Sequence, residues 1–247
     1  NSSWEIYITW YFKWNTDIFW FTLPTNASSK NIFVTKLNSS WVWLASTWTT
    51  SWLATSSDQW TSIELDSSWN VYVAWDFSQT VTFFWSWSIY AWSSWKFTIF
   101  LSKFDSDLNL DWIVDSYWAV SDYDTWPRIK ASNWFIYMAW RSQGTDVFWV
   151  SVTNIWNHDK LFAKFNQIDW STVWLKKLWS DWWDWWFDIE VDNNWYIYST
   201  WKFSWTSNVE WQNIVSAWSA DIFLTKYDIN WNFIWEKRAW WTSWDIW

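Results

Sequence analysis

Tryptophan occupies positions in this sequence where tight turns need glycine. The chain holds 40 Trp and one Gly in 247 residues, whereas glycine makes up about 7% of ordinary proteins. Many of the Trp follow Ser or Asn in turn-forming segments, for example at residues 67–70, 193–195 and 230–232. Such turns need a residue with positive φ, which glycine adopts freely. We therefore expect glycine to suit these positions better than tryptophan.

The single glycine points the same way. Gly144 lies four residues after Trp140, and in two other copies of the same repeat that slot holds Trp14 and Trp205. Some bacteria translate the codon UGA as glycine. If such a gene were translated with a genetic code that assigns UGA to tryptophan, the result would be a sequence like this one. The hypothesis is that most Trp letters stand for glycine; the alternatives are a deliberate Gly-to-Trp substitution or a truly Trp-rich protein. A non-Gly residue at positive φ costs about 1–2 kcal/mol, so a dozen would rival the net stability of a domain, about 5–15 kcal/mol.

Length, cysteine content and charge limit the class of protein. A chain of 247 residues fits one large all-β domain or two small ones. The absence of cysteine excludes a disulfide scaffold and thiolate metal sites. A net charge of −9 argues against a nucleic-acid partner, which needs a basic surface. No run of about 18 apolar residues predicts a membrane span. The chain begins at Asn1 without a signal peptide, and we expect it to be part of something longer.

Four copies of one unit run through the chain. A Tyr motif, in which tyrosine lies between apolar residues, starts at Trp4, Trp69, Trp134 and Trp195, with spacings of 65, 65 and 61. A Lys motif follows each copy, in segments 32–38, 99–105, 161–166 and 222–228. A third strand contains a Trp that we expect to be genuine: Trp43, Trp112, Trp174 and Trp235. A fourth short strand precedes the Tyr motif in segments 61–66, 127–131 and 187–192. Alternating apolar and polar residues predict β-strands throughout.

This periodicity favours an all-β protein in which each unit of about 62 residues is one sheet. Four short antiparallel strands per repeat are typical of a β-propeller blade, and a β-helix or other solenoid is the alternative. Residues 1–247 are predicted to be a single repeat domain of about four blades, repeating every 61–65 residues. An open arc or partial propeller is favoured over a closed four-bladed ring. The four Lys-motif lysines, Lys36, Lys103, Lys164 and Lys226, are expected on solvated strand faces.

With glycine restored at the turn tryptophans, the repeats resemble the β-propeller family known as SBBP (seven-bladed β-propeller repeat). The matching phrases are SS(G)NVYVA(G) at residues 67–75, DIFLTKYD at 221–228 and N(G)NFIWEKRA(GG) at 230–241. They recur four times and span the chain. The resemblance implies a propeller scaffold of secreted and surface proteins, and therefore an extracellular or cell-surface location, but it implies no single activity.

Few residues point to catalysis. His158 is the only histidine and lies in a loop with Asn157 and Asp159. A Ser-His-Asp triad is conceivable there, but no other feature of the sequence supports one. No phosphate loop or G-x-S-x-G elbow follows a strand and opens a helix. We therefore predict no catalytic residues and no cofactor.

Calcium is the one metal that the sequence suggests. Asp107, Asn109, Asp111 and Asp115 place oxygen ligands at alternating positions, as a calcium loop does. Two features weaken the pattern: the twelfth position is Trp118 instead of a bidentate Glu, and the repeat assigns Trp112 to a strand. The acidic segment 181–188 is a second loop that could hold a cation, although such a stretch is more often a simple turn.

These observations predict a non-enzymatic binding or structural module that works through the loops between strands. The segments between the Tyr and Lys motifs, such as 76–95 and 202–218, vary most between copies, as recognition loops on a fixed scaffold do. The expected partner is an unknown protein or carbohydrate. The alternatives are a propeller hydrolase or lyase acting on polysaccharide and a calcium-stabilised adhesion module. Carbohydrate binding by stacking of sugars on exposed Trp rings is expected only if these residues are genuine tryptophans.

Overall fold

A computed structural model describes most of the chain, in the ranges 4–13, 16–18, 21–23, 30–51, 59–78, 80–83, 87–90, 97–116, 125–142, 146–148, 150–151, 159–180, 185–203, 206–209, 212–216 and 221–239. Within these ranges all regular structure is β-strand and every strand pairing is antiparallel. The all-β prediction is therefore confirmed.

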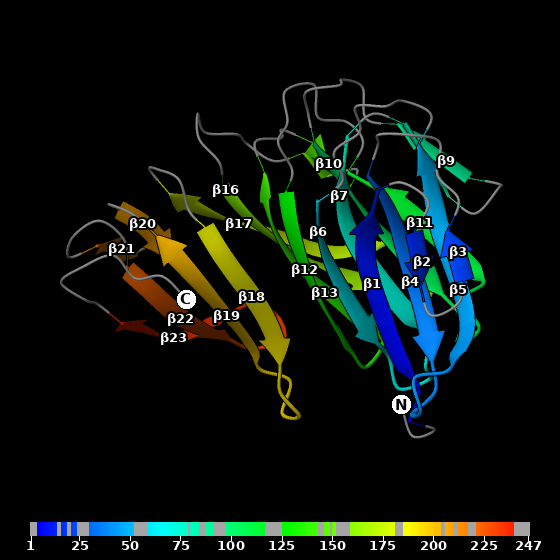
Figure 1. Ribbon diagram of the computed structural model, residues 1–247. Helices are drawn as coiled ribbons and strands as arrows, with labels where there is room; N and C mark the ends of the chain where they lie inside the picture. The colour runs from blue at the N-terminus through cyan, green and yellow to red at the C-terminus, as the bar shows by residue number, and fades with distance from the viewer. Residues whose placement is uncertain are drawn as a thin grey trace.

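The strands form four main sheets that follow one plan along the chain (Figure 1). Sheet 1 consists of β1 (Ile6–Phe12), β4 (Asn31–Leu37) and β5 (Trp43–Ser51). Sheet 2 consists of β6 (Gln59–Leu65), β7 (Val71–Phe77), β10 (Thr98–Phe104) and β11 (Leu110–Asp115). Sheet 3 consists of β12 (Thr125–Ser132), β13 (Phe135–Ser142), β16 (Asp159–Asn166) and β17 (Thr172–Ser180). Sheet 4 consists of β18 (Trp185–Val191), β19 (Ile197–Phe203), β22 (Asp221–Tyr227) and β23 (Phe233–Ala239).

Each predicted motif falls on the same strand of its sheet. The Tyr motif forms β1, β7, β13 and β19, and the Lys motif forms the strands that pair with them, β4, β10, β16 and β22. The strands with the expected genuine Trp lie on the far side of the Lys-motif strands. The short strands that precede the Tyr motif are β6, β12 and β18. Three sheets therefore have the expected four strands, and sheet 1 has the last three of them.

The strands that open sheets 2, 3 and 4 lie next to one another. We call β6, β12 and β18 the inner strands, because β6 packs against β12 and β12 packs against β18. The side chain of Ser62 on β6 accepts a hydrogen bond from the backbone of Ile129 on β12, at 3.1 Å. In sheet 1 the position before β1 has no strand among the described residues, and β1 itself contacts β6.

A small hairpin is inserted between the second and third strand of every unit. We call these four elements the insertion hairpins: β2–β3 (Thr16–Ile18 and Phe21–Leu23), β8–β9 (Thr80–Phe83 and Trp87–Tyr90), β14–β15 (Asp146–Val147 and Val150–Ser151) and β20–β21 (Thr206–Val209 and Gln212–Val215). Two of them extend the sheet of the preceding unit, because β8 pairs with β5 and β20 pairs with β17. These pairings tie sheet 1 to sheet 2 and sheet 3 to sheet 4.

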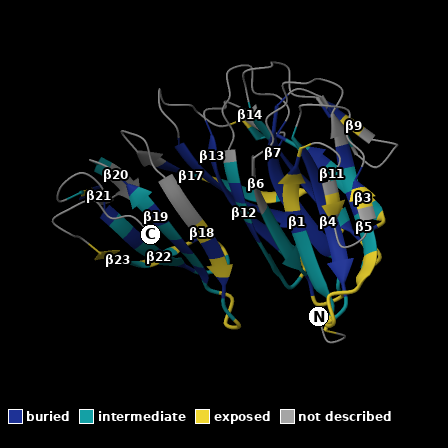
Figure 2. Cartoon of the chain, in the orientation of Figure 1, coloured by how far each residue is buried: buried dark blue, intermediate teal, exposed yellow. Residues whose placement is uncertain are grey.

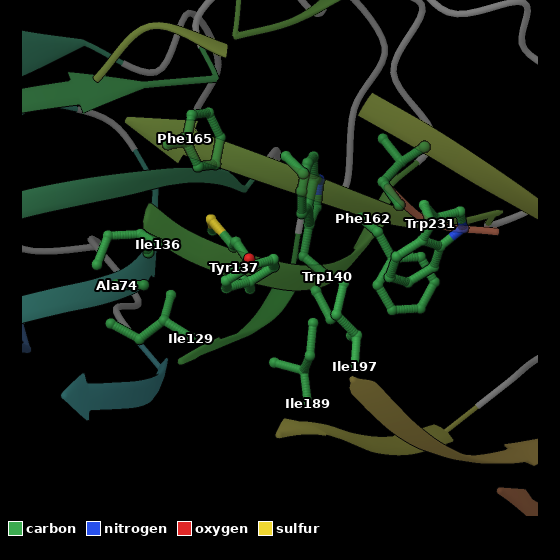
Figure 3. Packing of buried hydrophobic residues seen from close by; sticks show 14 of the residues in the cluster. Ala74, Ile129, Ile136, Tyr137, Trp140, Phe162, Phe165, Ile189, Ile197 and Trp231 are labelled. Carbon is green, nitrogen blue, oxygen red and sulfur yellow. The ribbon is translucent and has the colours of Figure 1, made fainter. Parts of the chain in front are cut away.

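The main hydrophobic core lies between neighbouring sheets (Figure 2). It joins residues of sheets 2, 3 and 4, and Figure 3 shows Ile129, Tyr137 and Ile189 within it. Aromatic rings are close there, as between Phe162 and Trp201, whose centroids are 4.8 Å apart. Burial of this apolar surface is the main force that holds one sheet on the next.

The prediction that the Lys-motif lysines lie on solvated faces is wrong for two of them. Lys36 and Lys164 are buried. Lys36 contacts Asp107 in a turn of the next sheet, and the Lys164 ammonium lies over the rings of Phe135 and Tyr137 in its own sheet. Lys103 and Lys226 are only partly exposed.

Candidate binding surfaces

One hairpin turn recurs at the same end of the sheets. Asp66 shows its geometry: its Oδ1 accepts hydrogen bonds from the backbone N–H of Ser68 at 2.8 Å and of Asn70 at 3.0 Å. The Asp66 carbonyl accepts a third, from the Trp69 N–H at 3.1 Å. Asn38, Asp105, Asp192 and Asp228 open turns of the same design. We call these five segments the Asx turns, in which a short side chain takes the place of backbone hydrogen-bond acceptors.

Every Asx turn places its fourth residue at positive φ. The angles lie between 61° and 69°, at Trp41, Trp69, Leu108, Trp195 and Trp231. A turn followed by one residue in the left-handed region is the usual three-residue hairpin with a bulge, and glycine is the residue it favours. Four of the five sites carry Trp, and Trp4, Trp126 and Trp170 also have positive φ.

Other tryptophans have ordinary strand geometry. Trp75, Trp140 and Trp201 end the Tyr motif, are fully buried and have no positive φ. Within the described residues, however, the indole N–H groups of Trp75 and Trp140 have no hydrogen-bond partner. An unpaired buried donor costs about 1–3 kcal/mol. The backbone therefore supplies a reason for glycine at the turns but not at these three strand positions.

Tyr, Lys and Trp lie side by side in sheets 2, 3 and 4. In sheet 1, Lys36 pairs with Ala45 instead, and Trp43 pairs with Leu37. In sheet 3, Lys164 pairs with Tyr137 on one side and Trp174 on the other. The Lys164 ammonium lies 3.9 Å from the ring centroid of Phe135 and 5.6 Å from that of Tyr137. Burial lowers the pKa of Lys164, and contact with aromatic faces offsets part of the loss of hydration. In sheet 3 the repeated Lys is thus part of the aromatic packing on that face.

A row of charged side chains runs across the three inner strands. Lys130 on β12 lies between Glu64 on β6, at 3.5 Å, and Glu190 on β18, at 2.9 Å. We call Glu64, Lys130 and Glu190 the inner charge row. All three hold the same place in their units, two residues before the residue that opens the next turn.

Burial and pairing act in opposite directions on these charges. Burial raises the pKa of Glu64, and the nearby Lys130 only partly compensates. For Lys130, burial alone would lower the pKa, but hydrogen bonding to Glu190 and the field of both glutamates raise it overall. Burial also lowers the pKa of Arg128, against the opposing fields of Asp188 and Asp76. The inner strands therefore hold a mixed, partly buried set of charges.

Two hollows lie on the described surface. One, of about 280 Å³, is lined by Tyr7 of β1 and by Ile63, Glu64 and Leu65 of β6. The other, of about 410 Å³, lies beside the Asx turns of sheet 4 and is lined by Asn194, Trp195, Tyr196, Asp228 and Ile229. The first is the hollow that adjoins the inner charge row.

The proposed calcium ligands have other partners in the structure. Asp107 lies in an Asx turn and contacts Lys36 at 3.4 Å, and Asp111 on β11 pairs with Lys103 at 2.8 Å. The Asn109 side chain donates to Asp105, and Asp115 ends β11. Among the described residues, no three acidic or His side chains gather as metal ligands. A calcium site at these residues remains a prediction from the sequence.

Other predicted positions lie partly outside the described residues. His158, Gly144 and residues 181–184 are not described, whereas Asp188 lies exposed on β18. Trp112 and Trp174 are half-buried and pack against Tyr72 and Tyr137, with ring centroids 6.1 and 6.3 Å apart. Within the described residues their indole N–H groups, like those of Trp75 and Trp140, have no hydrogen-bond partner.

The sequence analysis missed the inner charge row. Its signal was present, because each inner strand carries a charged residue between two apolar ones at one fixed distance from the following turn.

Comparison with known proteins adds no identity. No family model matches the chain, and a search of curated proteins finds no match. No described helix is long and apolar enough to cross a membrane.

Proposed function

We propose that this chain is a portion of a β-propeller that serves as a non-enzymatic binding scaffold, outside the cell or on its surface. The observation that supports it best is the repeated plan of the sheets: inner strands lie next to one another and every unit carries an insertion hairpin at one place. In a propeller, blades are repeated around such a row of inner strands. The resemblance of the repeats to the SBBP family, with glycine restored at the turn tryptophans, supports the propeller and the extracellular or cell-surface location.

The insertion hairpins are the proposed recognition elements. The connection between the second and third strands leaves each sheet at the end opposite the Asx turns, so all four hairpins are inserted at that end. They combine anchored residues, such as Val81 and Ile214, with exposed ones, such as Asp17 and Val215. Variable loops on a rigid sheet are where binding sites commonly lie.

Array binding with a charge-reversal variant and a charge-neutralising control tests this function. The chain is applied to arrays of polysaccharides and of surface proteins, and the ligand found is titrated against Asp17→Lys in β2–β3. Asp192→Asn in an Asx turn at the opposite end is the matched control. We expect the first variant to weaken binding at least several-fold and the control to leave it unchanged. Equal binding by all three proteins, or no ligand on either array, contradicts the proposal.

The inner charge row favours one second candidate, a hydrolase or lyase. Glu64 has a raised pKa beside Lys130, and carboxylates with shifted pKa values occur at catalytic sites. Incubation with the same polysaccharides, followed by measurement of new reducing ends or unsaturated products, separates the two functions. The scaffold proposal predicts no turnover, whereas turnover that disappears in Glu64→Gln would establish the enzyme.

A further inference from the structure

The hollow between β1 and β6 lies where the other sheets have an additional strand. In sheets 2, 3 and 4 the Tyr-motif strand pairs with an inner strand, as Tyr72 pairs with Glu64 and Tyr137 with Lys130. In sheet 1 the strand β1 is the edge of the sheet, and on that side no strand pairs with it among the described residues. An unpaired edge presents backbone N–H and C=O groups that a further strand can use.

Ile63 provides a second, independent sign that the inner row is incomplete. Its counterparts Ile129 and Ile189 are 3% and 2% exposed, because a neighbouring inner strand covers each of them. Ile63 is only partly buried and lines the hollow together with Leu65 and Tyr7. The hollow thus exposes apolar surface that equivalent positions bury.

The charge of the hollow specifies the kind of strand that fits. Charges alternate along the inner charge row, from Glu190 to Lys130 to Glu64. Lys130 lies on one side of Glu64, and the hollow lies on the other. The equivalent residue of a strand in the hollow would lie opposite Tyr7, next to Glu64. A basic residue there continues the alternation, whereas an acidic one repels Glu64.

We propose that this hollow is a strand-acceptor site for an extended segment that carries Lys or Arg between two apolar residues. The segment pairs antiparallel with β1, covers Ile63 and places its basic side chain against Glu64. This strand-acceptor site is separate from the insertion hairpins that are proposed to bind ligand, and it does not depend on whether they do.

The chain itself supplies a matched pair of probes. A peptide of residues 127–132, Pro-Arg-Ile-Lys-Ala-Ser, has the required pattern, and the same peptide with Lys130→Glu reverses one charge. Fluorescently labelled peptides are titrated against the full chain and followed by anisotropy, at low and at high salt. Hydrogen exchange then locates the bound peptide. We expect the Lys peptide to bind at least ten-fold more tightly than the Glu peptide, and this difference in affinity to become smaller at high salt. We also expect the bound Lys peptide to protect the amides of residues 6–12 from hydrogen exchange.

A charge-swap variant removes the remaining ambiguity. Glu64→Lys is expected to reverse the preference so that the Glu peptide binds more tightly, and its thermal unfolding is measured to show that it folds. If Glu64→Lys does not fold, the two peptides and the exchange pattern on the unaltered chain decide alone. Equal affinity for both peptides, no binding of either, or protection away from β1 and β6 would overturn the proposal.

Discussion

Five Asx turns place a residue at positive φ after an Asp or Asn, and four of these residues are tryptophan. The side-chain acceptor at the start of the turn holds two backbone N–H groups, so the bend is well defined whatever residue follows. Tryptophan at such a position bears a steric penalty of about 1–2 kcal/mol that glycine avoids. At Trp231 the penalty is opposed by packing, because its ring stacks on Tyr227 with centroids 4.1 Å apart.

Substitution of glycine at exposed turn positions should stabilise the chain. We expect Trp195→Gly to raise the free energy of unfolding by about 1 kcal/mol, because relief of the positive φ exceeds the backbone entropy that glycine loses on folding. Trp174→Gly is the control, since this half-buried residue packs against Tyr137 at ordinary φ. It should lower the free energy by about 3–5 kcal/mol. Urea unfolding measures both, and destabilisation by Trp195→Gly would contradict the interpretation of the turn.

The Asx turns should also make stability depend on acid. Burial opposes ionisation of Asp105, Asp192 and Asp228, but hydrogen bonds from the turn outweigh it and lower the pKa of each carboxyl. A folded pKa below the unfolded value of about 3.9 gives stability that is present above pH 4 and is lost as the pH falls through the folded value. We expect unfolding by urea to become easier below about pH 4. A triple variant with Asn in place of Asp105, Asp192 and Asp228 should lose much of this dependence of stability on pH. Asn can replace Asp here, because Asn38 already accepts the same hydrogen bonds in the first unit. An unchanged pH profile would contradict it.

At the scale of elements, the inner strands combine apolar packing with paired charges. Lys130 lies between two glutamates, so its removal leaves two like charges without the cation that separates them. The alternation explains why three adjacent strands can each place a charged residue at the same position of the repeat.

Reversal of the central charge should destabilise the row in a salt-dependent way. We expect Lys130→Glu to lower the free energy of unfolding by about 1–3 kcal/mol, because three carboxylates then adjoin, and Lys130→Gln to cost less. High salt should reduce the difference between the two variants. Equal stability of both variants at low salt would show that the row contributes nothing.

The insertion hairpins should be anchored through their buried residues only. Val81 is fully buried against Ile32 of the preceding sheet, whereas Val215 is 61% exposed. We expect Val81→Asp to destabilise the chain by about 3 kcal/mol, because a charge is buried. Val215→Asp should change stability by no more than about 0.5 kcal/mol. Similar losses in chemical denaturation would show that the hairpins are not anchored as described.

Sequence patterns predicted the strands well because their information is local. Alternation and turn residues identified the Tyr-motif and Lys-motif strands, and the repeat assigned the Trp strands. Burial of Lys36 could not be predicted, because the residue contacts Asp107 of the next sheet, which lies far away in sequence. The pairing of β8 with β5 and of β20 with β17 is likewise a contact between units. The inner charge row was visible in the sequence only by aligning the charged positions of the copies.

At the scale of the whole molecule, the four sheets repeat one unit whose turns, core and inner strands are interdependent. The Asx turns set the strand register, the register brings Tyr, Lys and Trp to the face between sheets, and stacking of the sheets aligns the inner strands. A residue that fits the left-handed region at each turn therefore supports the entire repeat.

The codon and peptide identity at Trp69 and Trp195 test this account most directly. The gene is sequenced, and the natural polypeptide is digested and analysed by mass spectrometry across both turns. The account predicts UGA codons and glycine in the peptides, which agrees with φ values of 67° and 69°. UGG codons with tryptophan in the peptides of a stably folded natural protein would contradict it.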